Sequence, residues 1–300
     1  MAVSSEETED ARRRYAFVTP PSRLPGLVAS ATGYHTTDNP VGLHRGLPSP
    51  YLAFIFALDD APIIGADTPD RALTPAAPRA EVLLGGLHQR PAYVVQPRSQ
   101  VGIQLAVHPL AARRLFGPPT RELTELVGDG VAVLGAEAAR LRERMAETPT
   151  WAERFELLWA YLRRRVEATE RVEAPPPALV EGWRWLARFG GTGSMDGLAR
   201  HLGYSGRRVS QLFGAELGAS PKQVGRLFRF DLARRQIAAD IDRTGRSDLG
   251  RVAAERGYYD QSHLVRDFRQ YTGTSPSRWI AEEFRNIQAG GHRAPEDSPP

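Results

Sequence analysis

The sequence predicts an α+β protein with a β-rich N-terminal domain, barrel-like or sandwich-like and followed by helices, and an all-α C-terminal domain. Short apolar and β-branched runs broken by Pro and Gly fill the first third of the chain, which is typical of strands. The apolar spacing then becomes helical. Near the C-terminus a helix-turn-helix pattern occurs twice, with a long predicted helix between the copies, so the second domain contains an internal repeat.

Length and composition bound the domain organisation. A chain of 300 residues suggests two domains, and its ordinary apolar content is sufficient for a sizeable core. We expect the N-terminal domain at 15–174 and the C-terminal domain at 179–285. A linker is expected at 175–178, because consecutive prolines cannot propagate a helix. The polar ends, 1–14 and 286–300, are expected to be disordered.

Composition also excludes several function classes. The chain has no cysteine, which removes disulfides, thiol nucleophiles and zinc sites built on cysteine. No window holds the roughly 18 uncharged apolar residues that a membrane span requires, and the N-terminus begins with acidic residues instead of a signal sequence. We therefore expect a cytoplasmic protein with no membrane partner.

The N-terminal domain is predicted to contain a mainly antiparallel sheet and then helices. The expected strands are the apolar runs at 27–29, 51–58, 81–84, 92–95 and 101–107. Helical spacing follows at 111–116, 123–127, 136–145 and 151–167. On the last of these helices, Trp151, Phe155, Leu158, Trp159 and Leu162 form one stripe, which favours a core or helix-to-helix interface over a cofactor site and leaves a dimer contact open.

The more distinctive copy of the helix-turn-helix pattern lies near residue 257. A helix with apolar spacing stops at Gly257, a residue type that adopts positive φ at low cost, and Asp260 caps the next helix. Leu264 and Phe268 are four residues apart and point into the domain. The opposite side carries four polar residues and one valine: Gln261, Ser262, Val265, Arg266 and Arg269.

The other copy begins near residue 195 and repeats the same landmarks. Gly203 makes the turn, and Ser205 caps a helix whose inner face carries Val209, Leu212 and Phe213. Its outward residues are Arg207, Arg208, Ser210 and Gln211. A shift of 55 positions superimposes Phe213 on Phe268, and the Gly-x-Ser-Pro segment at 218–221 on that at 273–276.

These outward faces predict contact with double-stranded DNA. Amide, hydroxyl, methyl and guanidinium groups are those that read base edges in the major groove, so we expect Arg207, Ser210 and Gln211 to read bases and Arg208 to bind phosphate. The positive charge surplus also lies with the repeat: residues 192–285 contain fifteen Arg and one Lys against eleven acidic residues. The helix that starts at Pro221 and runs to about Ile241 would set the distance between the units, and one DNA turn is roughly 34 Å.

Five segments of the C-terminal domain resemble the AraC/XylS family of bacterial transcription regulators. They are Leu-Ala-Arg-His-Leu-Gly-Tyr-Ser at 198–205, Gly-Ala-Ser-Pro at 218–221, Arg-Phe-Asp-Leu-Ala at 229–233, the Gly-Tyr to Phe segment at 257–268, and Gly-Thr-Ser-Pro at 273–276. The resemblance implies a seven-helix domain that binds promoter DNA and more often activates transcription than represses it, by contacting RNA polymerase. Two positions depart from the family pattern: Leu264 stands where an aromatic is common, and Gln236 where an aliphatic is usual.

In this family the outward positions that match six of these residues tend to contact bases; the six are Arg207, Ser210, Gln211, Gln261, Ser262 and Arg266. The N-terminal domain is often a β-rich sensor or dimerisation domain. A small-molecule effector, a homodimer and a protein partner without an effector therefore remain open.

An enzymatic N-terminal domain is the remaining alternative. Its histidines, His35, His44, His88 and His108, are scattered and have no helical metal-ligand spacing or carboxylate partner at a fixed offset. No nucleophile elbow or phosphate-cradling loop is present in the sequence. We expect no catalytic residue, no metal, no cofactor and no enzymatic activity.

Overall fold

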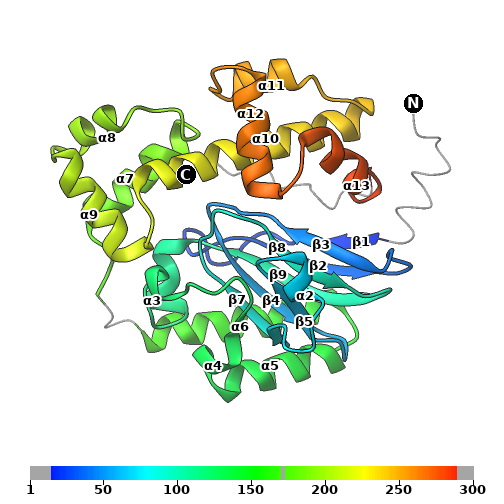
Figure 1. Ribbon diagram of the computed structural model, residues 1–300. Coiled ribbons are helices and arrows are strands. Elements are labelled where there is room, and N and C mark those ends of the chain that lie inside the picture. Colours follow the sequence, from blue (N-terminus) through cyan, green and yellow to red (C-terminus); the bar gives the residue numbers. More distant parts are fainter. Residues whose placement is uncertain (1–14, 170–172, 289–300) are drawn as a thin grey trace.

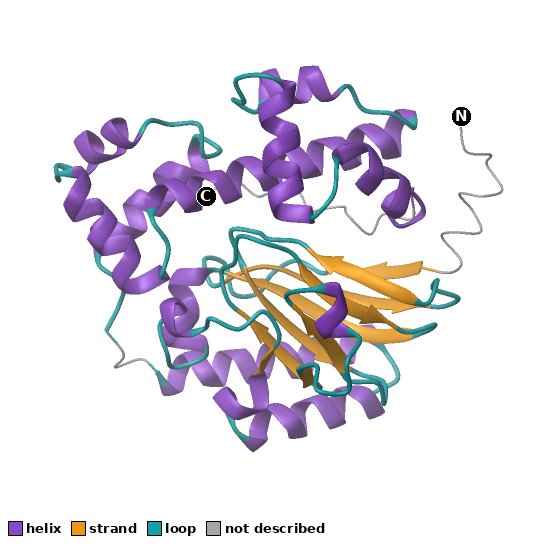
Figure 2. Ribbon diagram, in the orientation of Figure 1, coloured by secondary structure: helices purple, strands orange, loops and turns teal. Residues whose placement is uncertain are grey.

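The computed structural model describes residues 15–169 and 173–288. The segment 1–14 and most of the segment 286–300, both predicted to be disordered, lie outside this range. Figure 1 shows the N-terminal sheets between two layers of helices, with the C-terminal helices on one side and α4 to α6 on the other. Figure 2 shows the same division by secondary structure, with all strands in the N-terminal part. The predicted fold class, an antiparallel β-rich region followed by a helical one, is confirmed.

The strands form two antiparallel sheets. The larger has the order β1 (Tyr15–Val18), β2 (Val28–Thr36), β9 (Gln100–Val107), β4 (Leu52–Ala57), β7 (Val82–Gly85) and β10 (Gly128–Asp129). The smaller has the order β3 (Gly42–Gly46), β8 (Ala92–Gln96), β5 (Ile63–Ala66) and β6 (Arg79–Ala80). Neither sheet closes on itself within the described strands, so the barrel alternative is wrong and two open sheets take its place.

The core of the N-terminal part lies between the larger sheet and the helices that follow it. These helices are η1 (Pro109–Ala111), α3 (Ala112–Leu115), η2 (Thr120–Glu122), α4 (Gly130–Leu134), α5 (Ala136–Glu147) and α6 (Trp151–Ala168), while α2 (Pro69–Ala72) follows β5. Alternate residues of a strand share one face, so Phe54, Phe56, Ile103 and Leu105 all point at the helices and are fully buried.

The aromatic stripe on α6 belongs to this core. Phe155, Leu158, Trp159 and Leu162 are buried in the same cluster as the sheet residues. Trp151 covers Gly33 on β2, where a Cβ atom would lie 2.6 Å from the indole ring. The core interpretation is therefore confirmed, and these side chains do not form a free surface.

The helix predicted at 123–127 is wrong. Leu123 and Val127 are both buried, but they belong to different clusters on different faces of the larger sheet. The segment between them is a non-helical connection that lies against Gly86, whose amide donates to the Glu125 carbonyl at 3.1 Å. The sequence spacing that suggested a helix arises because this connection contacts the sheet edge at both ends.

The C-terminal part consists of seven described helices. They are α7 (Pro177–Arg188), α8 (Met195–Leu202), α9 (Gly206–Leu217), α10 (Pro221–Thr244), α11 (Leu249–Glu255), α12 (Gln261–Thr272) and α13 (Pro276–Gln288). Pro177, predicted in the linker, is the first residue of α7, a position where a missing N–H costs nothing. Similarly, α13 continues three residues beyond the expected end of the domain at 285.

Two apolar clusters hold these helices together. Leu198, Phe213 and Val224 belong to the cluster of the first helix-turn-helix unit, and Phe230 and Phe268 to that of the second. Leu87, between β7 and β8, packs against both clusters and against the N-terminal core. The two parts of the chain are thus in direct apolar contact. No described helix is long and apolar enough to cross a membrane.

Candidate nucleic-acid interface

The turns of the two helix-turn-helix units have the same backbone geometry. Gly203 and Gly257 each adopt a φ of +68°, in the left-handed region that glycine tolerates best. The next amide in each turn donates to a carbonyl of the preceding helix, from Tyr204 to Ala199 and from Tyr258 to Ala253, both at 3.0 Å. The repeat seen in the sequence is therefore also a structural repeat.

The second helix of each unit, α9 or α12, also begins and ends alike. The Ser205 hydroxyl accepts from the Arg208 amide at 3.2 Å, and the Asp260 carboxylate accepts from the His263 amide at 2.7 Å. Both helices are 12 residues long and stop at a left-handed glycine, Gly218 or Gly273. These shared caps give the two helices the same length and the same exposed N-terminal half. We call α9 and α12 the recognition helices.

The structure places all nine predicted DNA-contacting residues on the recognition helices. Arg207, Arg208, Ser210 and Gln211 are exposed on α9; Gln261, Ser262, Arg266 and Arg269 are exposed on α12, and Val265 is partly buried beside them. Of the side chains predicted to point inward, Val209, Phe213, Leu264 and Phe268 are buried. Leu212 is only partly buried. Each recognition helix therefore has a polar outer side and an apolar inner side.

The arginines on these outer sides differ from those on α10. Within the described residues, Arg207, Arg208, Arg266 and Arg269 form no ion pair. By contrast, Arg226 and Arg229 on α10 both pair with Asp267, at 2.8 and 3.4 Å, and Arg234 and Arg235 both pair with Asp231, at 2.8 Å each. The guanidinium groups on the recognition helices are thus available to bind phosphate or base edges.

Each recognition helix also has one acidic residue on the side opposite its polar face. On α12 this residue is Asp267, which is 4% exposed and accepts from Arg226 and Arg229 of α10. On α9 it is Glu216, which is 7% exposed and accepts from Arg113 of α3. The anchor of α12 therefore comes from within the C-terminal part, and that of α9 from the N-terminal part.

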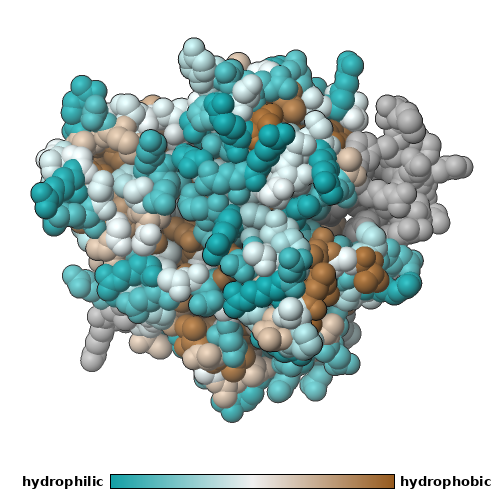
Figure 3. All heavy atoms as spheres, viewed as in Figure 1, coloured by the Kyte–Doolittle hydropathy of each residue, from teal (hydrophilic) through white to brown (hydrophobic). Residues whose placement is uncertain are grey.

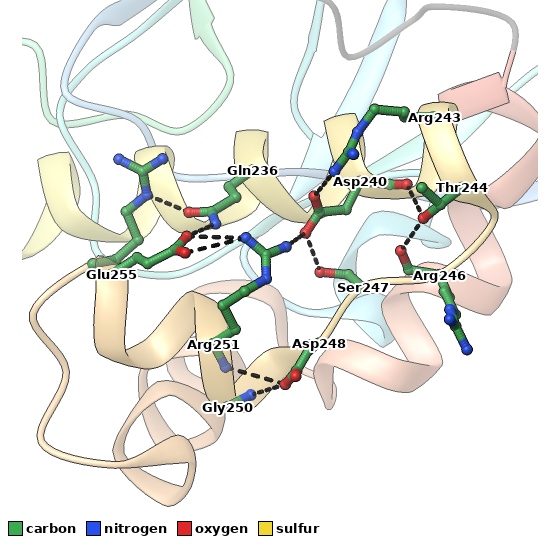
Figure 4. Close-up of polar contacts among 11 residues, drawn as sticks. Gln236, Asp240, Arg243, Thr244, Arg246, Ser247, Asp248, Gly250, Arg251 and Glu255 are labelled. Carbon is green, nitrogen blue, oxygen red and sulfur yellow. Dashed lines mark hydrogen bonds and ion pairs between the residues drawn. The ribbon is translucent and has the colours of Figure 1, made fainter.

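A polar network fixes α11 to the end of α10 (Figure 4). Buried Asp240 accepts from Arg251 at 2.6 Å, from Arg243 at 3.0 Å and from the Ser247 hydroxyl at 2.9 Å. Gln236, one of the two residues that depart from the family pattern, donates to Glu255 and accepts from Arg256. Hydrogen bonds thus take the place of an aliphatic contact between α10 and α11 at this position.

Aromatic residues complete the support of the second unit. Tyr258 lies under the Arg229 guanidinium, which is 4.6 Å from its ring centre, and burial raises the pKa of its phenol. Burial also raises the pKa of Tyr271 to about 12. His263 packs edge-on against Tyr258, and its Nδ1 accepts from the Tyr259 amide at 3.4 Å. These contacts give His263 a structural role in the turn.

Tyr259 is an exposed residue at this surface that the sequence did not single out. Its side chain is 93% exposed and directly precedes the Asp260 cap, and Tyr204 precedes the Ser205 cap with 45% exposure. The feature of the sequence that could have identified Tyr259 is the length of the turn. The second turn is one residue longer than the first, and Tyr259 is the additional residue. The face shown in Figure 3 is mainly hydrophilic with separate hydrophobic patches.

The structure brings together no cluster of metal-ligating side chains in the described part of the chain. No group of three His, Asp or Glu side chains lies close enough to hold a metal ion there. Burial lowers the pKa of His88, and it lowers that of His108 to about 4 with a further contribution from Arg184. His108 packs instead against Trp183 of α7, with 5.0 Å between ring centres.

Comparisons with known proteins agree with this geometry. Residues 198–282 match the family model of a helix-turn-helix domain. No curated protein sequence matches the chain significantly. Among solved structures, the chain is similar to an apo variant of ToxT from Vibrio cholerae, with a TM-score of 0.51 and 11% identity over 84% of this chain and 97% of that chain. A second ToxT structure from Vibrio cholerae gives a TM-score of 0.48 and 10% identity over 89% and 98%.

The family match covers both turns, both recognition helices and the long helix between them, and the structural match covers most of the chain. The predicted resemblance is therefore confirmed: the chain carries an AraC-type helix-turn-helix domain and is a DNA-binding transcription regulator.

Proposed function

We propose that the protein activates transcription by inserting α9 and α12 into successive major grooves of promoter DNA and by contacting RNA polymerase. The observation that carries this proposal is the pair of equivalent, exposed polar faces whose arginines have no partner among the described residues. Bases would be read by Arg207, Ser210 and Gln211 of α9 and by Gln261, Ser262 and Arg266 of α12. Arg208 and Arg269 would bind phosphate, and Val265 would contact a thymine methyl group.

The length of α10 supports a two-groove arrangement. This helix has 24 residues and joins the first unit to the second. At about 1.5 Å per residue it spans roughly 36 Å, close to the roughly 34 Å of one turn of B-DNA. We infer that the length of α10 matches the spacing of neighbouring major grooves on one face of the duplex.

Tyr259 is proposed as an additional contact to the DNA backbone. Tyrosine hydroxyls are common donors to phosphate oxygens, and the N-terminus of a recognition helix also favours anions. A ring that the protein leaves 93% exposed at that point is free to approach the sugar-phosphate chain. Tyr204, which directly precedes the cap of α9, would make the smaller contact.

The proposed function is tested with duplexes selected from random sequence by repeated binding and amplification. The full chain is expected to bind the selected duplex at least about a thousandfold more tightly than a scrambled duplex at the same salt concentration. The affinity is expected to fall steeply as salt rises, because arginine-phosphate contacts release counterions. Selection that yields no common sequence, or an affinity that does not respond to salt, would contradict the proposal. Transcription in vitro from a promoter carrying the selected site tests the activator role.

We propose that the N-terminal part binds a small-molecule effector. On the central strands of the larger sheet, Phe54 and Leu105 are fully buried on the helix side, whereas the paired residues Ile55 and Gln104 on the other side are partly buried and exposed. Ile63 and Ala80 of the smaller sheet pack in one cluster with Ile55, whereas Gln104 is exposed, so the smaller sheet covers this face only in part. A partly covered apolar face favours a ligand over a filled core. Screening small molecules for an increase in melting temperature tests this. If no compound in the screen raises the melting temperature and sedimentation shows a dimer, the N-terminal part would instead serve dimerisation.

A further inference from the structure

The side of α9 that faces away from the proposed DNA surface carries a single acidic residue. Glu216 follows Arg207 by nine positions, which is two and a half helical turns, so the two side chains lie on opposite sides of the helix. Glu216 is almost fully buried. A buried carboxylate requires a charged or hydrogen-bonding partner, and that partner determines how the helix is held.

Arg113 of α3 is that partner. Its Nε donates to Oε1 of Glu216 at 2.8 Å, and its Nη2 donates to Oε2 at 3.0 Å. Two parallel bonds between a planar guanidinium and a planar carboxylate fix a direction as well as a distance. This pair therefore restrains the rotation of α9 about its axis and not only its position.

Further contacts hold the last turn of α9. Arg121 of η2 donates from Nη1 to the Ala215 carbonyl at 2.7 Å. A Cβ atom on Gly218 would lie 3.1 Å from the Cα atom of Arg121, so the backbones approach closely. Leu110 of η1 belongs to the same apolar cluster as Phe213. We call Leu110, Arg113 and Arg121 the α9 socket.

The same end of α12 has weaker contacts to the N-terminal part. The Tyr271 hydroxyl bonds to Gln89 at 3.2 Å, and a Cβ atom on Gly273 would lie 2.5 Å from the Tyr93 hydroxyl. Both partners are neutral side chains. The carboxylate on the back of α12, Asp267, is held by α10 instead. The orientation of α12 is thus set within the C-terminal part.

We infer that Arg113 and Arg121 are positioning residues for base reading by α9. Through the α9 socket, the N-terminal part sets the direction of α9 relative to α12, and so it sets the spacing between the two half-sites that the chain accepts. The inference rests on the proposed function, because it concerns the same two recognition helices on one duplex.

The test measures binding of the full chain to duplexes in which the two selected half-sites are moved apart or together by one or two base pairs. The wild type is expected to lose about tenfold or more in affinity for a change of one base pair. Arg113→Gln is expected to bind the original spacing more weakly and to lose less than about threefold on a change of spacing. Base substitutions in the half-site of α9 should matter less for this variant, whereas those in the half-site of α12 should matter as much as before.

Three controls separate positioning from general structural damage. The exchanged pair, Arg113→Glu with Glu216→Arg, is expected to restore the spacing preference, which a merely unstable protein would not regain. Arg163→Gln removes an exposed arginine of α6 and should leave DNA binding unchanged. Arg121→Gln gives a second, milder variant should Arg113→Gln fold poorly, and it should relax the spacing preference in the same direction.

Two outcomes overturn the inference. If Arg113→Gln and Arg121→Gln both keep the spacing preference of the wild type, the inference is wrong and the proposed function still stands. A wild type that shows no preference for any selected pair of half-sites would overturn the proposed function and this inference together.

Discussion

The two helix-turn-helix units share their turns and caps but differ in what holds their recognition helices. Asp267 on the back of α12 is 4% exposed and pairs with two arginines of α10, of which Arg229 is 14% exposed. Glu216 on the back of α9 pairs with Arg113 of the N-terminal part, which is 32% exposed. The second unit therefore carries its own anchor, while the first depends on the docking of another domain.

This difference shows that a repeated motif can keep its local chemistry while its support changes. A turn glycine, a cap and a core aromatic specify each unit. The direction of the recognition helix is a separate property, which depends on the groups packed behind it. The comparison predicts that the two units respond alike to damage in their cores and differently to damage behind their recognition helices.

The largest effect is expected from removing the core aromatic of either unit. Phe213→Ala and Phe268→Ala should each lower the free energy of unfolding by about 3–5 kcal/mol, because each deletes a fully buried ring. Thermal melts followed by circular dichroism measure this. A normal melt for either variant would show that its ring is not part of the core.

Removing the buried acidic residue of each unit should lower the free energy of unfolding by different amounts in the two units. Asp267→Ala leaves Arg226 and Arg229 without their shared partner and should cost about 3–5 kcal/mol of unfolding free energy. Glu216→Ala should cost only about 1–2 kcal/mol, because Arg113 can regain water. Chemical denaturation of both variants gives the difference. Equal costs would contradict the distinction between an internal anchor and a docked one.

Removing one arginine from each polar face should weaken DNA binding to a similar extent. Arg207→Ala and Arg266→Ala are each expected to cost about 1–3 kcal/mol on the selected duplex if they make bidentate base contacts. Titration against selected and scrambled duplexes measures this. Equal losses on both duplexes would assign the residue to phosphate instead of to bases.

Acid should loosen the contact of the N-terminal part with the first unit. His108 lies against Trp183, and burial lowers its pKa to about 4. The folded protein therefore holds fewer protons than the unfolded chain between about pH 6.5 and pH 4, so stability is full above pH 6.5 and falls as the pH drops. At pH 4.5 the loss from this residue should be about 2 kcal/mol.

The control for this effect is His108→Gln, which cannot titrate. Urea denaturation of both proteins at pH 7 and pH 4.5 should show a smaller acid-induced loss for the variant. The same loss in both proteins would mean that His108 does not report on this contact.

The smallest effect is expected from the turn tyrosines. Tyr259→Phe removes one hydroxyl from a side chain that touches little of the protein, so it should leave the melt unchanged and weaken DNA binding by about 0.5–1.5 kcal/mol. Tyr204→Phe, the matched change in the first unit, should have a smaller effect. Unchanged affinity for Tyr259→Phe would remove this residue from the interface.

The local chemistry of the DNA-binding domain could be predicted from the sequence because it depends on near neighbours. Gly257 needs positive φ, and Asp260 caps an amide three residues away. Helical spacing then places Arg266 outside and Phe268 inside. Tyr259 was missed because its exposure depends on the one-residue slip in the second turn.

The supports of the recognition helices could not be predicted because their partners are distant in the sequence. Arg113 and Glu216 are 103 residues apart, and nothing in their own segments marks them as a pair. The pairing of the strands could not be predicted for the same reason, because the paired strands are distant in the sequence. The helix predicted at 123–127 is wrong for this reason too, since its two buried residues at helical spacing contact different clusters. Pro177 was misplaced because proline at the first position of a helix looks like a linker.

The most direct test of the two-groove account is a hydroxyl-radical footprint of the full chain on its selected duplex. The account predicts two protected patches on one face of the DNA, about 10 base pairs apart, with Arg207→Ala weakening one patch and Arg266→Ala the other. A single patch, or one patch weakened by both variants, would contradict the claim that two recognition helices occupy neighbouring grooves.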